Sequence, residues 1–228
     1  MTGARSSEAR RLGRRFFDRP TVAVARDLLG AVLTVGIGRR SRPVRLVETE
    51  AYVAHDPASH AYRGRTERNR SMFAGPGTLY VYRIHQVVCA NVTTRPGEAV
   101  LLRAGVAIGP KPPNASGPGR LCRALGIVRG DDGTDVVGSA RIRLIPRAGP
   151  PPRTVAGPRV GIRRAVRRRL RFSIAGEPAV SRPRPAVAGR ISGASPSRSR
   201  GAGPSSRTRR TRRRPSGGGR SGGRTAGR

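Results

Sequence analysis

Lysine is almost absent from this sequence of 228 residues: Lys111 is the only one, and the other 46 basic residues are arginines. Enzymes that form a Schiff base with a sugar or carbonyl substrate need an amine nucleophile, which a lysine usually supplies. The one lysine lies in the proline-flanked segment GPKPP. The sequence therefore argues against lysine-based covalent catalysis.

Acidic residues are also scarce, with 12 against 47 basic residues and a formal net charge of +35. The excess persists in residues 1–180, which hold 33 basic and 12 acidic residues. A chain this basic repels itself unless it binds a polyanion, so nucleic acid is the expected partner.

A membrane surface is the rival partner for so much positive charge. The sequence has no apolar run long enough to span a bilayer and no basic amphipathic helix with a wide apolar face. Its N-terminus, MTGARSSEARRLGRRFF, lacks the apolar segment of a secretory signal. We therefore expect no membrane partner and a cytoplasmic location on the nucleoid.

Only two cysteines are present, Cys89 and Cys122. They are too few and too far apart in sequence for a metal site or a redox pair, so we expect reduced, buried thiols. No metal and no organic cofactor is expected.

The C-terminal region has no acidic and no aromatic residue: from Ser181 to Arg228 it holds 14 arginines among Gly, Ser, Pro and Thr. Such a composition cannot bury enough apolar surface to order itself. We therefore divide the chain into a basic N-terminal segment (1–14), one domain (15–181) and a disordered Arg-, Gly-, Ser- and Pro-rich tail (182–228). The tail is either a compositional or frameshifted extension, or an arm that tethers the protein to DNA.

Within the domain, periodicity predicts a mixed succession of elements. A helix follows the Asp-x-Pro start near residue 20 and ends near Gly30, a strand covers residues 31–37, and TLYVYRI and VVCANVT, within residues 78–93, form two strands of a hairpin. Further strands are predicted at AVLLRAGVAI, DVVGSARIRLIP, RVGI and LRFSIAG, and a short helix at GPGRLCRALGI. Strands and helices do not alternate regularly, which predicts an α+β fold: a single domain with a curved, mainly antiparallel sheet, a protruding β-hairpin and flanking helices.

The most informative strand is predicted at residues 44–53. Strict alternation places Leu46, Glu48, Glu50 and Tyr52 on one face and Val47, Thr49, Ala51 and Val53 on the other. The second face is apolar and should lie on the core. Glu48 and Glu50 are then expected to face a cleft or solvent.

Aromatic residues gather next to these carboxylates. All four tyrosines lie between residues 52 and 82, and the sequence has no tryptophan. A tyrosine cluster can be simple core packing, but beside a carboxylate it suggests a pocket in which nucleobases stack. A carboxylate repels phosphates, so in a nucleic-acid-binding protein its expected role is general base catalysis.

Nine segments between Phe16 and Ser181 together resemble the alkyladenine (3-methyladenine) DNA glycosylase family, in that family's order. They are VETEAY, DPASHA, RNRSMF, GTLYVY, CANV, VLLRA, GPGRLCRALGI, RVGI and LRFSIAGEPAVS. The resemblance implies a monofunctional enzyme of base excision repair. It would flip alkylated or deaminated purines, of the 3-methyladenine or hypoxanthine type, out of double-stranded DNA and leave an abasic site. A monomer is expected.

The resemblance also implies roles for individual residues. Glu50 matches the glutamate that activates a water against the sugar, with Arg103 and the carbonyl of Val160 helping to hold that water. Three residues match those that sandwich the flipped base, and a fourth matches the asparagine that excludes normal purines: Tyr52, His60, Tyr82 and Asn91. The arginines of RGRTERNR, among them Arg65, Arg68 and Arg70, would face phosphates.

The tip of the predicted hairpin departs from the family pattern. The wedge that fills the space left by the flipped base is usually a tyrosine at the hairpin tip, and here it is His85, followed by Gln86 in place of the usual glycine. Histidine stacks less area than tyrosine, so we expect weaker base flipping.

Two other functions stay open at this point. One is a lesion- or DNA-binding protein on the same fold with weak or lost catalysis. The other, a sugar glycosidase with Glu48 and Glu50 as acid and base, fits poorly, because residues two apart on one strand point the same way about 7 Å apart. We expect Glu48 to be the structural partner of an arginine.

Overall fold

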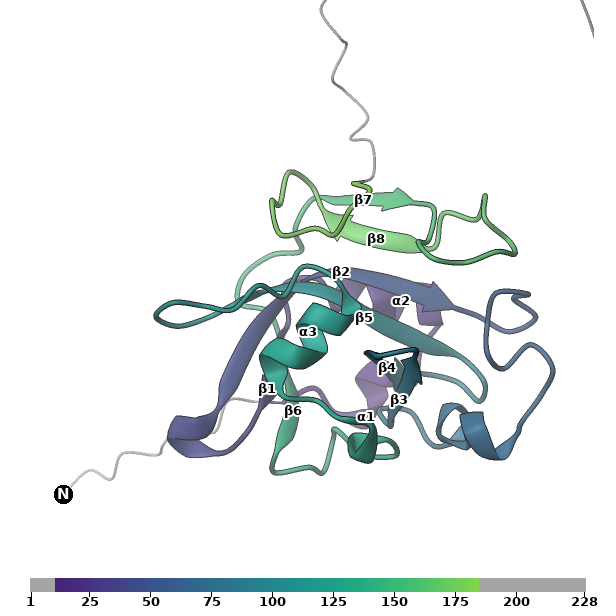
Figure 1. The fold of residues 1–228 in the computed structure, drawn as a ribbon, viewed down its shortest axis with the longest axis horizontal. Coiled ribbons are helices and arrows are strands. Elements are labelled where there is room, and N and C mark those ends of the chain that lie inside the picture. The colour runs from purple at the N-terminus through teal and green to yellow at the C-terminus, as the bar shows by residue number, and fades with distance from the viewer. Residues whose placement is uncertain (1–10, 185–228) are drawn as a thin grey trace, which may run out of the picture. The chain divides into compact units, whose positions relative to one another are not determined.

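A computed structural model describes residues 11–184, and all strand pairing within this part of the chain is antiparallel (Figure 1). One sheet runs in the order β3-β4-β5-β2-β1-β6, with β8 paired to β2 and β7 paired to β8. The strands are β1 (Val32–Val35), β2 (Arg42–Tyr52), β3 (Leu79–Ile84), β4 (Val87–Thr93), β5 (Ala99–Ala107), β6 (Ile142–Ile145), β7 (Thr154–Gly157) and β8 (Arg171–Ile174). The α-helices are α1 (Arg14–Phe17), α2 (Thr21–Asp27) and α3 (Pro118–Leu125). The predicted α+β class is confirmed.

Strand β2 is the centre of the sheet. One of its edges pairs with β5 along most of its length, whereas the other edge is shared: Arg42–Arg45 pair with β1, and Glu48–Glu50 pair with β8. The second half of β2, which carries Glu50, is thus held on both sides by strands. Backbone hydrogen bonds on both edges therefore fix the position of this part of β2, independently of its side chains.

The pairing of β2 with β5 contains two compensating irregularities. Leu46 pairs with Gly105 and Glu48 with Ala104, which leaves Val47 unpaired, and Thr49 pairs with Leu102, which leaves Arg103 unpaired. A residue added to a strand in this way bends the strand and re-aims the neighbouring side chains. The bulge therefore decides where the arginine points.

This bulge overturns the strict alternation expected for residues 44–53. Leu46 lies in the main core, and Val47, predicted to face that core, lies in a second cluster with Ala104 and Val180. Glu48 and Glu50 share a side with Tyr52 as expected, but neither carboxylate is exposed, since both residues have 0% relative accessibility.

The main core is formed where α2 and α3 pack against the sheet. Leu28, Leu29, Leu121 and Leu125 are buried there among the residues of β1, β2, β4 and β5. Helix α3 begins at Pro118, whose fixed φ suits the first turn. It ends at Leu125 and is capped by Gly126, which has φ of +72°, the left-handed conformation that favours glycine.

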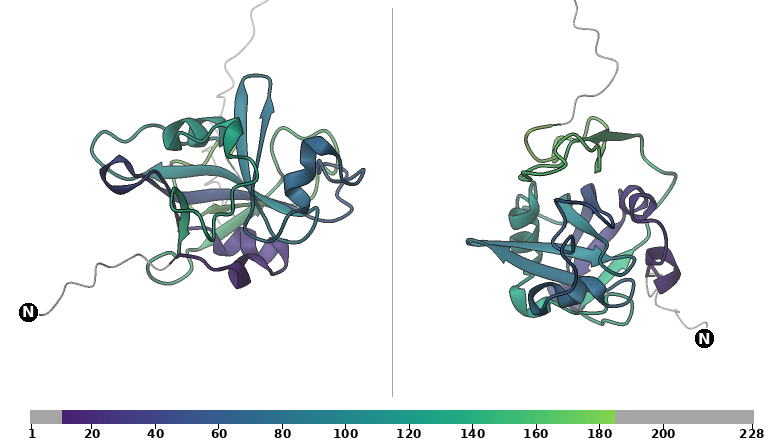
Figure 2. Two further views of the ribbon diagram at one scale, coloured as in Figure 1. Left: turned by 90° about the horizontal axis from the view of Figure 1, so that it is seen from below. Right: turned by 90° about the vertical axis from the view of Figure 1, so that its right-hand side faces the viewer.

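The hairpin of β3 and β4 stands away from the rest of the sheet, as the left view of Figure 2 shows. Its tip carries Ile84 and Val87, which are 47% and 45% exposed, on either side of His85 and Gln86. The predicted protruding hairpin is confirmed.

The segment RVGI is not a strand, contrary to the sequence-based expectation. It follows β7 as an irregular loop in which Gly161 has φ of +78°. The backbone N–H of Val160 donates to Glu50 rather than to a neighbouring strand.

Residues 185–228 of the predicted disordered tail and residues 1–10 of the N-terminal segment lie outside the described residues. Residues 182–184, predicted to belong to the tail, are described: the carbonyl of Pro183 accepts from Arg171, and Arg184 donates to the carbonyl of Pro178. Within residues 11–184, no helix is long and apolar enough to cross a membrane.

Candidate functional site

Glu50 on β2 is a fully buried carboxylate with three donors around it. Its Oε1 accepts from the N–H of Val160 at 2.9 Å and lies 3.4 Å from Nη1 of Arg103. Its Oε2 accepts from the hydroxyl of Tyr52 at 3.0 Å. Burial raises the pKa of Glu50 above its usual range, and Arg103, the Val160 N–H and the Tyr52 hydroxyl oppose that rise. A carboxyl with a raised pKa is suited to accept a proton.

Arg103, on the bulge of β5, joins Glu50 to Glu48. Its Nε donates to Oγ of Ser181 at 3.0 Å and lies 3.2 Å from Oε1 of Glu48, while its Nη1 faces Glu50. Glu48 also pairs with Arg171 of β8 and accepts from the N–H of Ser181 at 2.7 Å. The prediction that Glu48 is the partner of an arginine is confirmed.

Arg159 and Asp56 form a second buried ion pair that sequence reasoning missed. The two side chains have no exposed area, and two guanidinium nitrogens of Arg159 contact the two carboxylate oxygens of Asp56. The guanidinium also lies 4.6 Å from the centroid of the Tyr52 ring. Both residues belong to motifs quoted above, DPASHA and RVGI, but neither motif by itself indicates the pairing.

A cavity of about 570 Å³ opens over Tyr52, Arg103 and Val160. Seven of the predicted site residues line it, namely Tyr52, His60, Tyr82, His85, Asn91, Arg103 and Val160. Glu50 does not line the cavity itself but lies beneath three residues that do. The cavity is large enough for a purine and its walls are mostly aromatic and apolar.

The aromatic walls come from three separate segments. His60 belongs to the long loop after β2, and its ring lies 4.5 Å from that of Tyr82 on β3, edge to face. Its Nδ1 is 2.9 Å from the hydroxyl of Tyr80. Burial, followed by the positive charge of Arg68, lowers the pKa of His60, so its imidazole is neutral at neutral pH.

The floor near the hairpin contains polar groups with fixed orientations. Asn91 is buried, and its Nδ2 donates to the backbone carbonyl of Tyr80 at 3.0 Å, directly across the β3–β4 ladder. Cys89, expected to be a core thiol, is buried but also lines the cavity. Burial raises the pKa of its thiol, so the side chain stays neutral.

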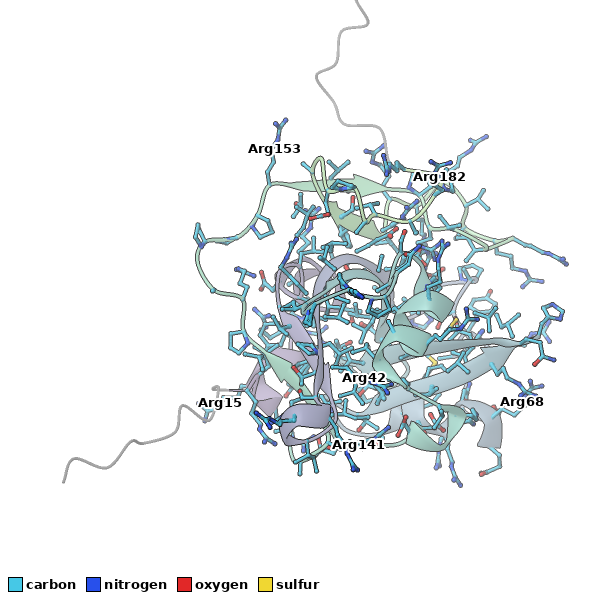
Figure 3. All side chains as sticks on the ribbon, turned by 60° about the vertical axis from the view of Figure 1, so that its left-hand side comes forward. Arg15, Arg42, Arg68, Arg141, Arg153 and Arg182 are labelled. Carbon is cyan, nitrogen blue, oxygen red and sulfur yellow. The ribbon has the colours of Figure 1, made fainter. Side chains whose placement is uncertain are left out.

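The three arginines predicted to contact phosphates are all exposed, but none of them lines the cavity. Arg68 projects outward (Figure 3) and is close enough to His60 to influence its pKa. Arg65 and Arg70 border a separate hollow of about 530 Å³, and Arg70 lies 3.4 Å from Glu67. Among residues 11–184, no group of three or more His, Cys, Asp or Glu side chains is arranged to hold a metal ion.

Comparison with known proteins identifies a family that matches most of the chain. The profile of the methylpurine-DNA glycosylase (MPG) family matches residues 15–178. Proteins named "Putative 3-methyladenine DNA glycosylase" are similar over most of their length. The one from Rhizobium etli is 43% identical over 188 residues, covering 75% of this chain and 88% of the relative. The one from Anaeromyxobacter dehalogenans is 44% identical over 189 residues, covering 78% and 89%. The one from Methanocella arvoryzae is 44% identical over 170 residues, covering 66% and 84%.

Proposed function

This chain belongs to the methylpurine-DNA glycosylase family, and from that membership we propose how its buried carboxylate and aromatic cavity act on DNA. The protein is a DNA glycosylase, an enzyme of DNA repair that hydrolyses N-glycosyl bonds. We propose that it flips alkylated or deaminated purines, of the 3-methyladenine and hypoxanthine type, out of duplex DNA. The base is then released by a water that Glu50 activates, leaving an abasic site in base excision repair.

The observation that carries the proposal is the environment of Glu50. An ionised carboxylate can accept about four hydrogen bonds, and the three donor groups around Glu50 leave room for one more. A water in that place would face the cavity beside Arg103 and the backbone of Val160. Glu50 would take its proton, and the negative charge near the sugar would stabilise an oxocarbenium-like transition state.

The cavity walls support a purine as the released group. Tyr52, His60 and Tyr82 offer ring surfaces, and stacking on aromatic side chains contributes about 1–3 kcal/mol per base. His60 in its neutral form can both donate and accept a hydrogen bond. Asn91, whose amide nitrogen is held by Tyr80, presents a fixed group to the base and would clash with the exocyclic amino group of guanine.

Three further points belong to the proposal. His85 at the hairpin tip would fill the space left by the flipped base, and Arg65, Arg68 and Arg70 would contact the phosphates. The domain would span residues 15–181 and act as a monomer. It would work in the cytoplasm, on the DNA of the nucleoid.

The test is single-turnover release of hypoxanthine and of 3-methyladenine from defined duplexes, with Glu50→Gln measured alongside. We expect release by the wild-type protein and a loss of at least about a thousandfold in Glu50→Gln, because general base catalysis and charge stabilisation are removed together. Tight binding of lesion duplexes should remain in the variant. A variant that releases either base at the wild-type rate would refute the role of Glu50.

A further inference from the structure

A segment close to the end of the described residues, 177–183, passes over the buried ion pairs, and we name it the C-terminal strap. It is fixed at both ends. Glu177 pairs with Arg45 at 2.8 Å, and the carbonyl of Pro183 accepts from Nη1 of Arg171 at 2.7 Å. Between these points Val180 is buried against Val47 and Ala104, the residues next to the bulge.

Ser181, in the middle of the strap, contacts three buried charged residues at once. Its Oγ accepts from Nε of Arg103 at 3.0 Å and donates to Oε1 of Glu48 at 3.1 Å. Its N–H donates to Oε2 of Glu48, and its carbonyl accepts from Nη2 of Arg171 at 2.8 Å. Ser181 is 3% exposed and is not among the residues that line the aromatic cavity.

These contacts hold one edge of the Arg103 guanidinium and leave the other edge for Glu50. The guanidinium is planar and rigid, so fixing Nε fixes the direction of Nη1. Arg103 also sits at an unpaired bulge position, where the β-ladder does not hold its backbone. The strap supplies the constraint that the ladder lacks at this residue.

We propose that Ser181 is a positioning residue for the glycosylase reaction: through Arg103 and Glu48, the C-terminal strap holds the catalytic carboxylate of Glu50 in its working geometry. The inference rests on the proposed function, since it assigns Glu50 as the base. It makes the C-terminal end of the domain part of the catalytic apparatus. Errors of about 1 Å in such a constellation can cost about a hundredfold in rate.

The experiment compares Ser181→Thr with Ser181→Val in the full-length chain. Both variants add a similar volume to a buried site, and only Thr keeps the hydroxyl, so their difference isolates the two hydrogen bonds of Oγ. We expect the single-turnover rate of Ser181→Val to be at least about tenfold lower than that of Ser181→Thr. The affinity for lesion duplexes should be equal in the two variants, because Ser181 does not line the cavity. Equal rates would overturn the inference.

A second measurement separates positioning from simple stability and does not depend on activity. The groups that act on Glu50 are Glu48 and Tyr52 on its own strand, Arg103 on β5 and the N–H of Val160. Arg171 on β8 is its partner in the β2–β8 pairing. Arg103 opposes the burial-induced rise in the Glu50 pKa. If Arg103 is less well held, that pKa should be higher in Ser181→Val than in Ser181→Thr, measured by NMR titration of labelled glutamate carboxyl carbons.

The chain has only six glutamates, so assignment through Glu50→Gln is feasible. The acid limb of the rate profile should move to higher pH in the same variant. Identical Glu50 titrations in the two variants would refute the inference, whether or not the protein releases damaged bases. The proposed function is tested separately, by release of hypoxanthine or 3-methyladenine by the wild-type protein. If both bulky variants are unfolded, we compare Ser181→Ala with Ser71→Ala instead. Ser71 is a buried serine that donates one hydrogen bond to Asp132 at 3.0 Å, and an equal reduction of the rate in these two would count against positioning.

Discussion

Glu50 is in a site that raises the free energy of its ionised form. Burial is the largest cause of its raised pKa, and the nearby charge of Glu48 adds to it, whereas Arg103 only partly compensates. Energy stored in this way is typical of a group kept for catalysis rather than for stability. The ionised form of Glu50 should therefore lower the free energy of unfolding, by an amount that depends on pH.

We expect Glu50→Gln to be more stable than the wild-type protein at pH 7. The pKa of Glu50 is higher in the folded than in the unfolded state, so the wild type loses stability as pH rises above the unfolded value of about 4.5. Glutamine does not titrate. Urea unfolding should therefore show little difference between the two proteins at pH 4 and an advantage for the variant at pH 7. A constant difference across this range would contradict the prediction.

Asp56 illustrates the opposite case, a buried charge whose partner is essential. Asp56→Ala leaves the buried guanidinium of Arg159 without its carboxylate, and breaking such a pair typically costs about 3–5 kcal/mol. We expect a decrease of that size in the free energy of unfolding. The control is Glu67→Ala, which removes an exposed carboxylate paired with Arg70 and should cost less than about 1 kcal/mol. Similar decreases in both variants would show that the buried pair is not special.

At the scale of the elements, the paired irregularities of β2 and β5 bring the catalytic groups together. The bulge turns Val47 toward the strap and frees Arg103 from the ladder, so the arginine reaches both glutamates. The sequence around β2, VRLVETEAYV, reads as a regular alternation and does not signal a bulge, whereas Gly105 in the interior of β5 is a residue that can mark one. The strands themselves could be predicted from the sequence, but the side chain directions could not.

Gly105 shows how close the two strands approach at this point. A Cβ there would lie 2.3 Å from Cγ1 of Val44 and 2.8 Å from the carbonyl oxygen of Arg45. We expect Gly105→Ala to lower the free energy of unfolding by about 1–3 kcal/mol through overpacking. It should also reduce the single-turnover rate, since the strands must move apart next to Arg103. Gly13→Ala, where nothing lies within 4 Å of the added Cβ, is the control. An equal effect of the two changes would contradict this account.

The loop after β7 marks another limit of prediction from sequence. RVGI is apolar enough to be interpreted as a strand, and its backbone is used instead to hold Glu50 and to place Arg159 behind Tyr52. The motif was informative through its resemblance to a family, whereas its secondary structure depends on a carboxylate more than 100 residues away. By contrast, α3 and the β3–β4 hairpin follow from local signals, Pro118 and Gly126 in one and two β-branched runs in the other.

At the scale of the whole molecule, the location of the few acidic residues helps to explain the positive charge of the surface. Glu48, Glu50 and Asp56 are fully buried against Arg103, Arg159 and Arg171. Three of the 12 acidic residues are thus paired with buried arginines, which leaves few to offset the arginines of the surface. The six arginines labelled in Figure 3 are all exposed, as expected of a protein that binds a polyanion.

The excess of positive charge continues in the sequence of the tail. Residues 185–228 contain 12 arginines and no acidic residue. If they act as a tethering arm, removing them should weaken binding to any duplex and reduce the salt dependence of affinity, by about 0.9 in the log–log slope for each phosphate that the arm neutralises. The rate of base release and the ratio of lesion to undamaged affinity should not change, because the strap ends at residue 183.

Two variants distinguish charge from chain length: truncation after Arg184, and a full-length chain with the tail arginines replaced by glutamine. We expect both to have the same shallower salt slope, since the effect is electrostatic and independent of sequence. Wild-type slopes in both variants would show that the tail does not contact DNA and is a compositional extension. A lower rate of base release in the truncation alone would instead connect the tail to the strap and to the positioning of Arg103.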